Sequence, residues 1–566
     1  MAAQKIARPE TASPGNSDTK FFGSQIGGKS AINYSYTDMP WRLMAYDVYY
    51  FFKFLWAIPF IVWPLSPADS GELSELSFTS KNIYAVAVHV VLVILQLGFI
   101  VALPSLVTVP VWTAAAAIAL FMLVNRTLAS LLNGDRVEYM SDEKYAPALP
   151  EHAHEQWIYI NGVAAGYVEL SHLATELINS QRTREHWMKS NLNRLAVTFK
   201  RPILGIHNKT SGILFDVIEC LIQRNLGYAT TDVRVCYSII KRKLYNPRYS
   251  KVIFILHSQG GIQGSLILDW LLQELPQDLL AKLEIYTFGN AANHFNNPHR
   301  HLHSQSLAKR NPLAASVDST QPAPADQPRR DLAFNPISGT SPNSVPDKDL
   351  AKSSNSDGAL PAIASSTTSS HPSALSDRAI GHIEHYAHTT DFVSLWGVLH
   401  FATSAPSSST IPRFMGRVFA RTSPRGGHQL VQHYLDGMFP LRKGPPYRGA
   451  GVPWGVEEEG NEFMESEVPL GGVGNCERDE DGDSDADGDG ESGNGSGSEE
   501  VAVIGMGLVK EGKGLTREKE RGEAVDVKAK VKELSRLWQY RNGRSPKEKP
   551  PLLARSEDGV VRNATM

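Results

Sequence analysis

One serine in the sequence has the local pattern of a catalytic nucleophile. Residues 252–256 are an apolar, β-branched run that is typical of a strand buried on both faces. Three glycines, Gly260, Gly261 and Gly264, follow this run, and apolar residues then recur at helical spacing. Ser258 therefore falls on a tight turn between a strand and a helix. Such a turn exposes a hydroxyl group for attack on an ester or amide carbonyl.

The neighbours of this serine match the usual Gly-x-Ser-x-Gly pattern on one side only. Gly260, two residues after Ser258, allows the strand and the helix to approach closely, whereas Leu256 stands where the pattern has its first glycine. The backbone amide of Gln259 would lie at the start of the helix, where it can stabilise an oxyanion. The alternative is an ordinary Ser/Gly turn that closes a strand–helix unit.

A serine nucleophile needs a base to take its proton and a carboxylate to orient that base. Asp391 directly follows a predicted strand and is the expected carboxylate, although it could instead cap the helix predicted from Phe392. His428 lies in a glycine-rich loop and is the expected base. The alternative bases are His433, which falls in a helical stretch, and His257, which is expected to pack beside the serine.

A second oxyanion donor is expected in the loop that follows an earlier strand, at residues 157–161. Gly162 or Val163 could supply a backbone amide there, because glycine lets the backbone come close to a substrate. A plain turn explains the same two residues.

Strands alternate with helical patterns from residue 150 onward, which predicts an α/β fold with a parallel sheet. We expect one domain made of residues 150–302 and 380–441. Residues 233–240 fit either a strand or the edge of a helix. The other predicted strands are 157–161, 202–206, 252–256, 283–288, 383–388 and 417–421.

Three motifs in this domain resemble the α/β-hydrolase superfamily, and within it a group of fungal membrane-associated, lipase-like serine hydrolases. They are Ile-Leu-His-Ser-Gln-Gly-Gly at 255–261, Tyr-Ala-His-Thr-Thr-Asp-Phe-Val at 386–393 and Gly-Gly-His-Gln-Leu-Val-Gln-His-Tyr-Leu at 426–435. The resemblance covers residues 155–302 and 380–441. It implies a doubly wound, mostly parallel sheet and hydrolysis through an acyl-enzyme.

Residues 41–132 are expected to be a membrane segment. Two apolar runs, 84–103 and 111–124, have lengths suited to a bilayer and would form two spans or a hairpin over 84–124. A pair of buried core helices is the alternative. The aromatic stretch 48–65 contains Lys53 and Pro59 and fits an interfacial or a spanning segment. Positive charges on both flanks of the segment predict that the hydrolase domain faces the cytoplasm.

The remaining stretches lack a hydrophobic period, so we expect disorder in residues 1–40 and 303–379 and in most of 442–566, where residues 528–540 could form a short charged helix. The acidic run 477–500 begins like a calcium loop but has Asn494 where a bidentate Glu is required, so no metal site is expected. Three cysteines are too few for a disulfide framework, and a net charge of −3 gives no case for nucleic-acid binding. No cofactor is expected.

These features together predict a membrane-anchored serine hydrolase that cleaves a carboxylic ester, either a lipid or another lipophilic molecule. Two other functions remain open. A hydrolase-fold scaffold would bind proteins at the membrane without catalysis, and an acyltransferase would use the same three residues with an alcohol in place of water.

Overall fold

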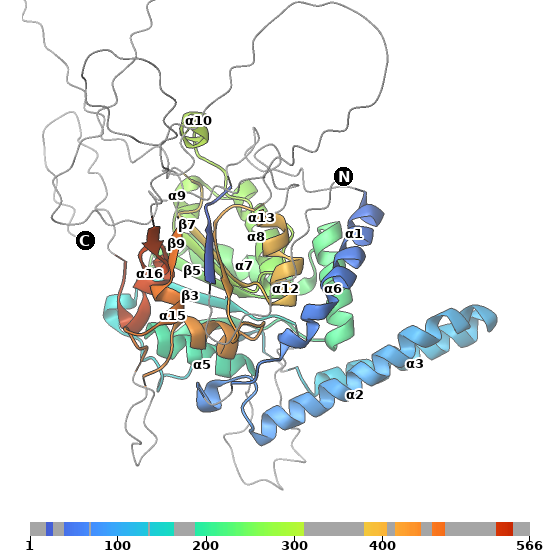
Figure 1. Ribbon diagram of the computed structural model, residues 1–566. Helices are drawn as coiled ribbons and strands as arrows, with labels where there is room; N and C mark the ends of the chain where they lie inside the picture. The colour runs from blue at the N-terminus through green and yellow to red at the C-terminus, as the bar shows by residue number, and fades with distance from the viewer. Residues whose placement is uncertain are drawn as a thin grey trace, which may run out of the picture.

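The computed structural model of the protein describes nine stretches of the chain. The described residues are 18–25, 39–66, 69–133, 136–163, 187–310, 378–403, 414–442, 455–469 and 528–546. Among them is an eight-stranded sheet with the strand order β1-β8-β7-β6-β5-β3-β4-β2. The sheet lies at the centre of the folded body, with helices packed around it (Figure 1). Its strands are β1 (Asp18–Phe22), β2 (Glu138–Met140), β3 (Glu155–Ile160), β4 (Ile203–Ile206), β5 (Lys251–His257), β6 (Leu283–Phe288), β7 (His382–His388) and β8 (Arg417–Thr422).

The six inner strands are parallel, and β1 and β2 pair antiparallel at the two edges. The prediction of a mostly parallel α/β sheet is therefore confirmed. In the register, Leu256 at the end of β5 lies opposite Ile160 on β3 and Thr287 on β6. The carboxyl ends of these parallel strands consequently meet at one edge of the sheet, where side chains from different strands can gather.

Alternate residues of the central strands enter two cores, one on each face of the sheet. Phe254 packs into one core and Ile255 into the other, and both side chains are fully buried. One face is covered by α6 (Ile213–Leu226), α7 (Thr231–Tyr245), α8 (Gln259–Glu274), α12 (Phe392–Trp396) and α13 (Val398–Thr403). The other is covered by α5 (Trp187–Phe199), the π-helix η7 (Leu430–Leu435), α14 (Asp436–Met438), α15 (Glu462–Glu465), α16 (Val531–Leu534) and α17 (Arg536–Gln539).

Residues 233–240, which the sequence left open between strand and helix, lie within α7. Val233, Cys236 and Ile240 are buried along one side of this helix, at the spacing of one helical face. The remaining short elements are η2 (Gly71–Leu73), η4 (Pro150–His152), α9 (Gln277–Leu280), α10 (Leu302–Arg310), β9 (Glu467–Pro469), β10 (Lys528–Lys530) and η8 (Arg541–Gly543).

Parts of the three stretches expected to be disordered are ordered. Residues 18–22 form the edge strand β1, in which Phe21 packs against Phe419 with ring centroids 5.3 Å apart. This strand has only five residues and two of its first three are charged, so it shows little hydrophobic pattern in the sequence. The helix α10 extends to Arg310, inside the predicted insertion. The predicted disorder of 1–17, 311–377, 470–527 and 547–566 lies outside the described residues.

The C-terminal stretch is also part of the fold, because two of its segments complete the core on one face of the sheet. Residues 455–469 contribute the buried Phe463 and Met464, and residues 528–546 contribute the buried Trp538 and Tyr540. The expectation that the fold ends near Leu441 is therefore wrong. Residues 528–540, where the sequence suggests a short charged helix, form β10, α16 and α17, whereas residues 455–469 are too short to show the period by which helices are recognised.

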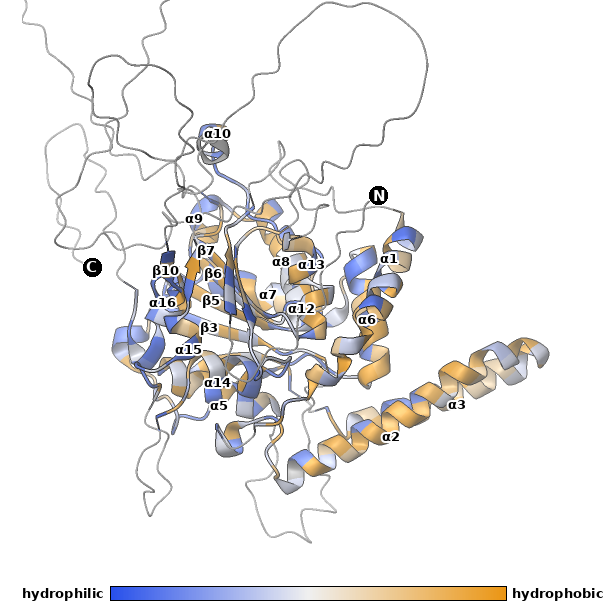
Figure 2. Cartoon of the chain, in the orientation of Figure 1, coloured by the Kyte–Doolittle hydropathy of each residue, from blue (hydrophilic) through white to orange (hydrophobic). Residues whose placement is uncertain are grey.

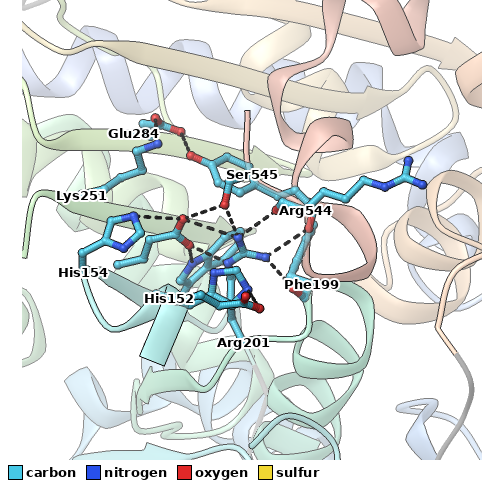
Figure 3. Close-up of polar contacts among 12 residues, drawn as sticks. His152, His154, Phe199, Arg201, Lys251, Glu284, Arg544 and Ser545 are labelled. Atoms are coloured by element: carbon cyan, nitrogen blue, oxygen red, sulfur yellow. Dashed lines mark hydrogen bonds and ion pairs between the residues drawn. The ribbon is translucent and has the colours of Figure 1, made fainter. Parts of the chain in front are cut away.

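A buried arginine, Arg201, connects the sheet to residues 544–545 near the end of the described chain (Figure 3). Arg201 contacts Glu155 at the start of β3, and its guanidinium also donates to the carbonyl of Arg544 at 2.8 Å and to the hydroxyl of Ser545 at 2.7 Å. Both charged side chains are almost fully buried, so each needs the other and these hydrogen bonds to offset its lost hydration.

Two long apolar helices project from the body of the molecule (Figure 2). The helix α2 (Ser80–Ala102) continues through η3 (Leu103–Thr108) and returns as α3 (Val111–Ser130). The two helices run antiparallel, with Phe99 stacked on Phe121 at 3.7 Å and Gln96 donating to Asn125 at 2.9 Å. By length and composition, 82–108 and 111–130 could each cross a membrane, and only 22% and 6% of their apolar windows are buried.

The aromatic stretch 48–65 does not form a continuous helix, and among the described residues only 82–108 and 111–130 form helices long and apolar enough to cross a membrane. The helix α1 (Pro40–Lys53) gives way to the 3-10 helix η1 (Leu55–Ile61), which contains Pro59. One side of α1 packs on the sheet domain, with the ring of Tyr50 against His400 at 4.0 Å and that of Phe51 against Phe392 at 5.5 Å.

Candidate active site

The turn between β5 and α8 holds Ser258 in an unusual backbone conformation. Its φ is 58° and its ψ is −122°, a combination that L-residues rarely adopt. The strand ends at His257 and the helix begins at Gln259, so the serine alone makes the reversal. This strained turn places the hydroxyl at the carboxyl edge of the sheet, as the sequence predicts.

Two glycines make room for this turn. A Cβ on Gly260 would lie 2.9 Å from the carbonyl oxygen of Ile160, so no side chain fits between the helix and β3. A Cβ on Gly264 would overlap the side chain of Leu256. In the usual pattern, a glycine at position 256 leaves this space empty. Here Gly264, one helical turn into α8, leaves it instead, which explains how Leu256 is accommodated.

Three side chains from separate strand ends form one hydrogen-bonded chain. The Nε2 atom of His428 lies 2.9 Å from Oγ of Ser258, and its Nδ1 atom lies 3.0 and 3.1 Å from the two carboxylate oxygens of Asp391. Asp391 follows β7 and His428 follows β8. All three side chains are buried, with 4% of Ser258, 7% of His428 and none of Asp391 exposed.

Asp391 is held as an acceptor by several donors besides the histidine. The hydroxyl of Tyr434 donates to its Oδ2 atom at 2.7 Å and that of Ser394 at 2.9 Å, while the amide of Val393 donates to Oδ1 at 2.8 Å. Burial by itself would raise the pKa of Asp391, but the charge of His428 and these hydrogen bonds lower it to about 2. The aspartate is therefore ionised at neutral pH, and it caps α12 as well as contacting His428.

This arrangement fixes the protons of the imidazole. Because ionised Asp391 can only accept hydrogen bonds, Nδ1 of His428 must carry a proton and donate a hydrogen bond to the carboxylate. In the neutral ring the Nε2 atom is then free of a proton and accepts from the hydroxyl of Ser258. The geometry is that of a general base ready to remove the serine proton, with a carboxylate that stabilises the resulting imidazolium.

The two other histidines considered from the sequence lie close by but have different partners. His433 accepts from the amide of Gln429 through Nδ1 at 2.9 Å and donates through Nε2 to the carbonyl of Pro64 at 2.9 Å. His257 donates to the backbone carbonyl of His428 at 2.8 Å, and burial together with repulsion from His428 lowers its pKa to about 3. Of the three histidines, His428 is the one whose ring nitrogen lies within hydrogen-bond distance of the serine hydroxyl.

The expected oxyanion residues also gather beside the serine. Gln259 supplies the first amide of α8, a position with no acceptor within the helix. Gly162 follows β3 and lies so close that a Cβ there would overlap Cβ of Ser258 and come within 3.0 Å of its Oγ. Asn161 holds the loop by accepting from the amide of Asn208 at 2.9 Å. Val163 is the last described residue of this loop and is partly buried.

Sequence reasoning missed the donors that hold Asp391. Ser394 is close to it in sequence, but Tyr434 lies 43 residues away, and a tyrosine in an apolar helical stretch gives no sign of its partner. Among the residues that the structure describes, no group of three His, Cys, Asp or Glu could hold a metal ion. Comparisons with family models, curated proteins and solved structures found no match, so the interpretation of the site depends on its geometry.

Proposed function

We propose that this protein is a membrane-anchored serine hydrolase of the α/β-hydrolase class that cleaves a carboxylic ester. The observation that carries the proposal is the unbroken chain from Ser258 through His428 to Asp391 on a strained strand–helix turn. A serine hydroxyl that only closes a turn has no need of a base aligned with it, nor of a buried carboxylate behind that base.

In the proposed reaction His428 takes the proton of Ser258 as its oxygen attacks the ester carbonyl. The negative charge on the carbonyl oxygen is stabilised by the backbone amides of Gln259 and of Gly162 or Val163. His428 then gives its proton to the departing alcohol, which leaves an acyl group on the serine. A water molecule, deprotonated by the same histidine, releases the acid and restores the hydroxyl.

A membrane location follows from the apolar surfaces of the N-terminal helices. The proposed hairpin of α2 and α3 has both ends at the folded body, where Asn133 donates to the carbonyl of Thr210 and Trp187 to Asn82. The outer side of α1 and η1 is also apolar, and its exposed large residues are Trp41, Tyr46, Val48, Tyr49, Phe52 and Leu55. Trp and Tyr favour the headgroup boundary, so we infer a lipid or lipophilic ester as substrate.

The test is to label the full-length, detergent-solubilised protein with a fluorophosphonate and map the modified residue. The proposal expects an adduct on Ser258 that is lost in His428→Ala and reduced about 10⁴-fold in rate in Asp391→Asn. His303→Ala, which changes an exposed histidine in α10 away from these three residues, serves as the matched control. A folded protein that takes up no label at Ser258 would instead support a non-catalytic scaffold.

The same preparation separates hydrolysis from acyl transfer. When a panel of esters is incubated with the protein and an added alcohol, a hydrolase releases mainly the free acid. An acyltransferase instead forms mainly a new ester with the added alcohol. Both products would require Ser258.

A further inference from the structure

The loop that carries His428 is held from outside by a distant segment. We call residues 59–66 the strap; they comprise the last three residues of η1 and the stretch that leads from it toward α2. The amide of His428 donates to the carbonyl of Phe60 at 3.1 Å. Side chains after the histidine make the other contacts with strap carbonyls: Gln429 with Ile61 at 2.9 Å, Gln432 with Val62 at 3.2 Å and His433 with Pro64 at 2.9 Å. Gln432 also accepts from the amide of Ser66 at 3.1 Å.

Glu75 makes one more contact of this kind, a little further along the chain. Its two carboxylate oxygens lie 3.0 and 3.2 Å from the amide of Val431, in the first turn of η7. That amide has no acceptor within its own helix, so the carboxylate serves as a cap from another part of the chain. Glu75 is only 5% exposed.

The loop depends on such support because of its own composition. Gly426 and Gly427 precede His428, and they have no side chains with which to fix its path. A Cβ on Gly427 would lie 2.6 Å from the carbonyl oxygen of Phe60, so glycine is also what lets the strap come this close. A small shift of the loop would move Nε2 of the histidine away from Oγ of Ser258.

We infer that the strap and Glu75 form a positioning device for the catalytic base, so that Glu75 acts on catalysis through the placement of His428. This inference rests on the proposed hydrolase function. The chain enters α2 at Ser80, five residues after Glu75. The triad is thus joined by a short connection to the helices proposed to lie in the membrane.

The test compares Glu75→Ala, which removes the acceptor for the Val431 amide, with Glu75→Gln, which keeps an acceptor oxygen. Glu72→Ala, an exposed carboxylate three residues earlier, is the matched control. We expect Glu75→Ala to lower kcat about tenfold or more with little change in KM. The substitution displaces His428 but does not alter the residues that contact the substrate. Glu75→Gln should restore most of kcat, and Glu72→Ala should leave kcat unchanged.

Each variant is assayed only after circular dichroism shows that it is folded. If Glu75→Ala does not fold, Gln432→Met is tested instead. This substitution removes two contacts with the strap at a similar side-chain volume, and we expect the same fall in kcat. A normal kcat in either folded variant would overturn the inference, as would a defect in Glu75→Ala that glutamine does not relieve. Absence of fluorophosphonate labelling in the wild type would instead overturn the proposed function, so the two failures are distinct.

Discussion

Leu256 and Gly264 occupy complementary space on the two sides of the serine turn. The leucine is fully buried, and a Cβ on the glycine would overlap its side chain. We expect Gly264→Ala to destabilise the protein by about 1–3 kcal/mol, as overpacking of a closed core does. Adding Leu256→Ala should relieve part of that cost, so the double variant should lose less than the sum of the single variants. Urea unfolding of the four proteins measures this, and strict additivity would contradict the proposed packing.

Gly162 is predicted to be essential for activity. Its Cβ position overlaps that of Ser258, so Gly162→Ala must push the oxyanion loop or the serine away from its place. We expect kcat/KM to fall about 100-fold or more, because a displacement of about 1 Å at a reacting group has an effect of this size. Gly437→Ala is the control, since nothing lies within 4 Å of a Cβ there. Equal activity of the two variants would exclude the arrangement described for the loop.

Tyr434 is predicted to support catalysis through Asp391. Tyr434→Phe removes one hydrogen bond to the carboxylate, which should raise the pKa of Asp391 and weaken its hold on His428. A hydrogen bond to a charged group contributes about 1.5–3 kcal/mol, so we expect kcat to fall about tenfold. Tyr540→Phe removes a similar 2.9 Å bond to buried Glu284, away from the site. Tyr540→Phe should lower the free energy of unfolding but leave kcat unchanged. If Tyr434→Phe and Tyr540→Phe have a similar kcat, the proposed role of Tyr434 is wrong.

The parts of the fold that the sequence predicts correctly are those with strong local patterns. The apolar run before Ser258 and the glycines after it specify a buried strand, a turn and a helix within twenty residues. Asp391 and His428 each follow a strand, and a parallel sheet brings strand ends together, so their meeting could be anticipated.

The parts that were missed depend on contacts between distant segments. β1 has five residues and gains its stability from pairing with β8, while Trp538 is buried only because residues 528–546 return to the sheet. The strap binds through backbone carbonyl groups, which every residue has. No residue type in 59–66 therefore identifies its partner in the sequence.

The free energy of unfolding should depend on pH through Glu75. Burial raises the pKa of this carboxyl from 4.5 to about 7, although the hydrogen bond from Val431 opposes the shift. Between these two values the unfolded chain releases the proton and the folded chain retains it. The contribution of Glu75 to stability is therefore greatest below pH 4.5 and declines until about pH 7, by roughly 3 kcal/mol in total.

Other groups titrate in the same range. The lowered pKa of His257 acts in the opposite direction, with stability rising with pH between about 3 and 6.5. The measurement must therefore be a difference between two proteins. Urea unfolding of the wild type and of Glu75→Gln, from pH 4.5 to 8, should show the stability of the wild type falling relative to the variant as the pH rises. Glu72→Gln should follow the wild type throughout. A constant difference between the wild type and Glu75→Gln would mean that Glu75 has a similar pKa in the folded and unfolded chains, and so is not enclosed beside His428.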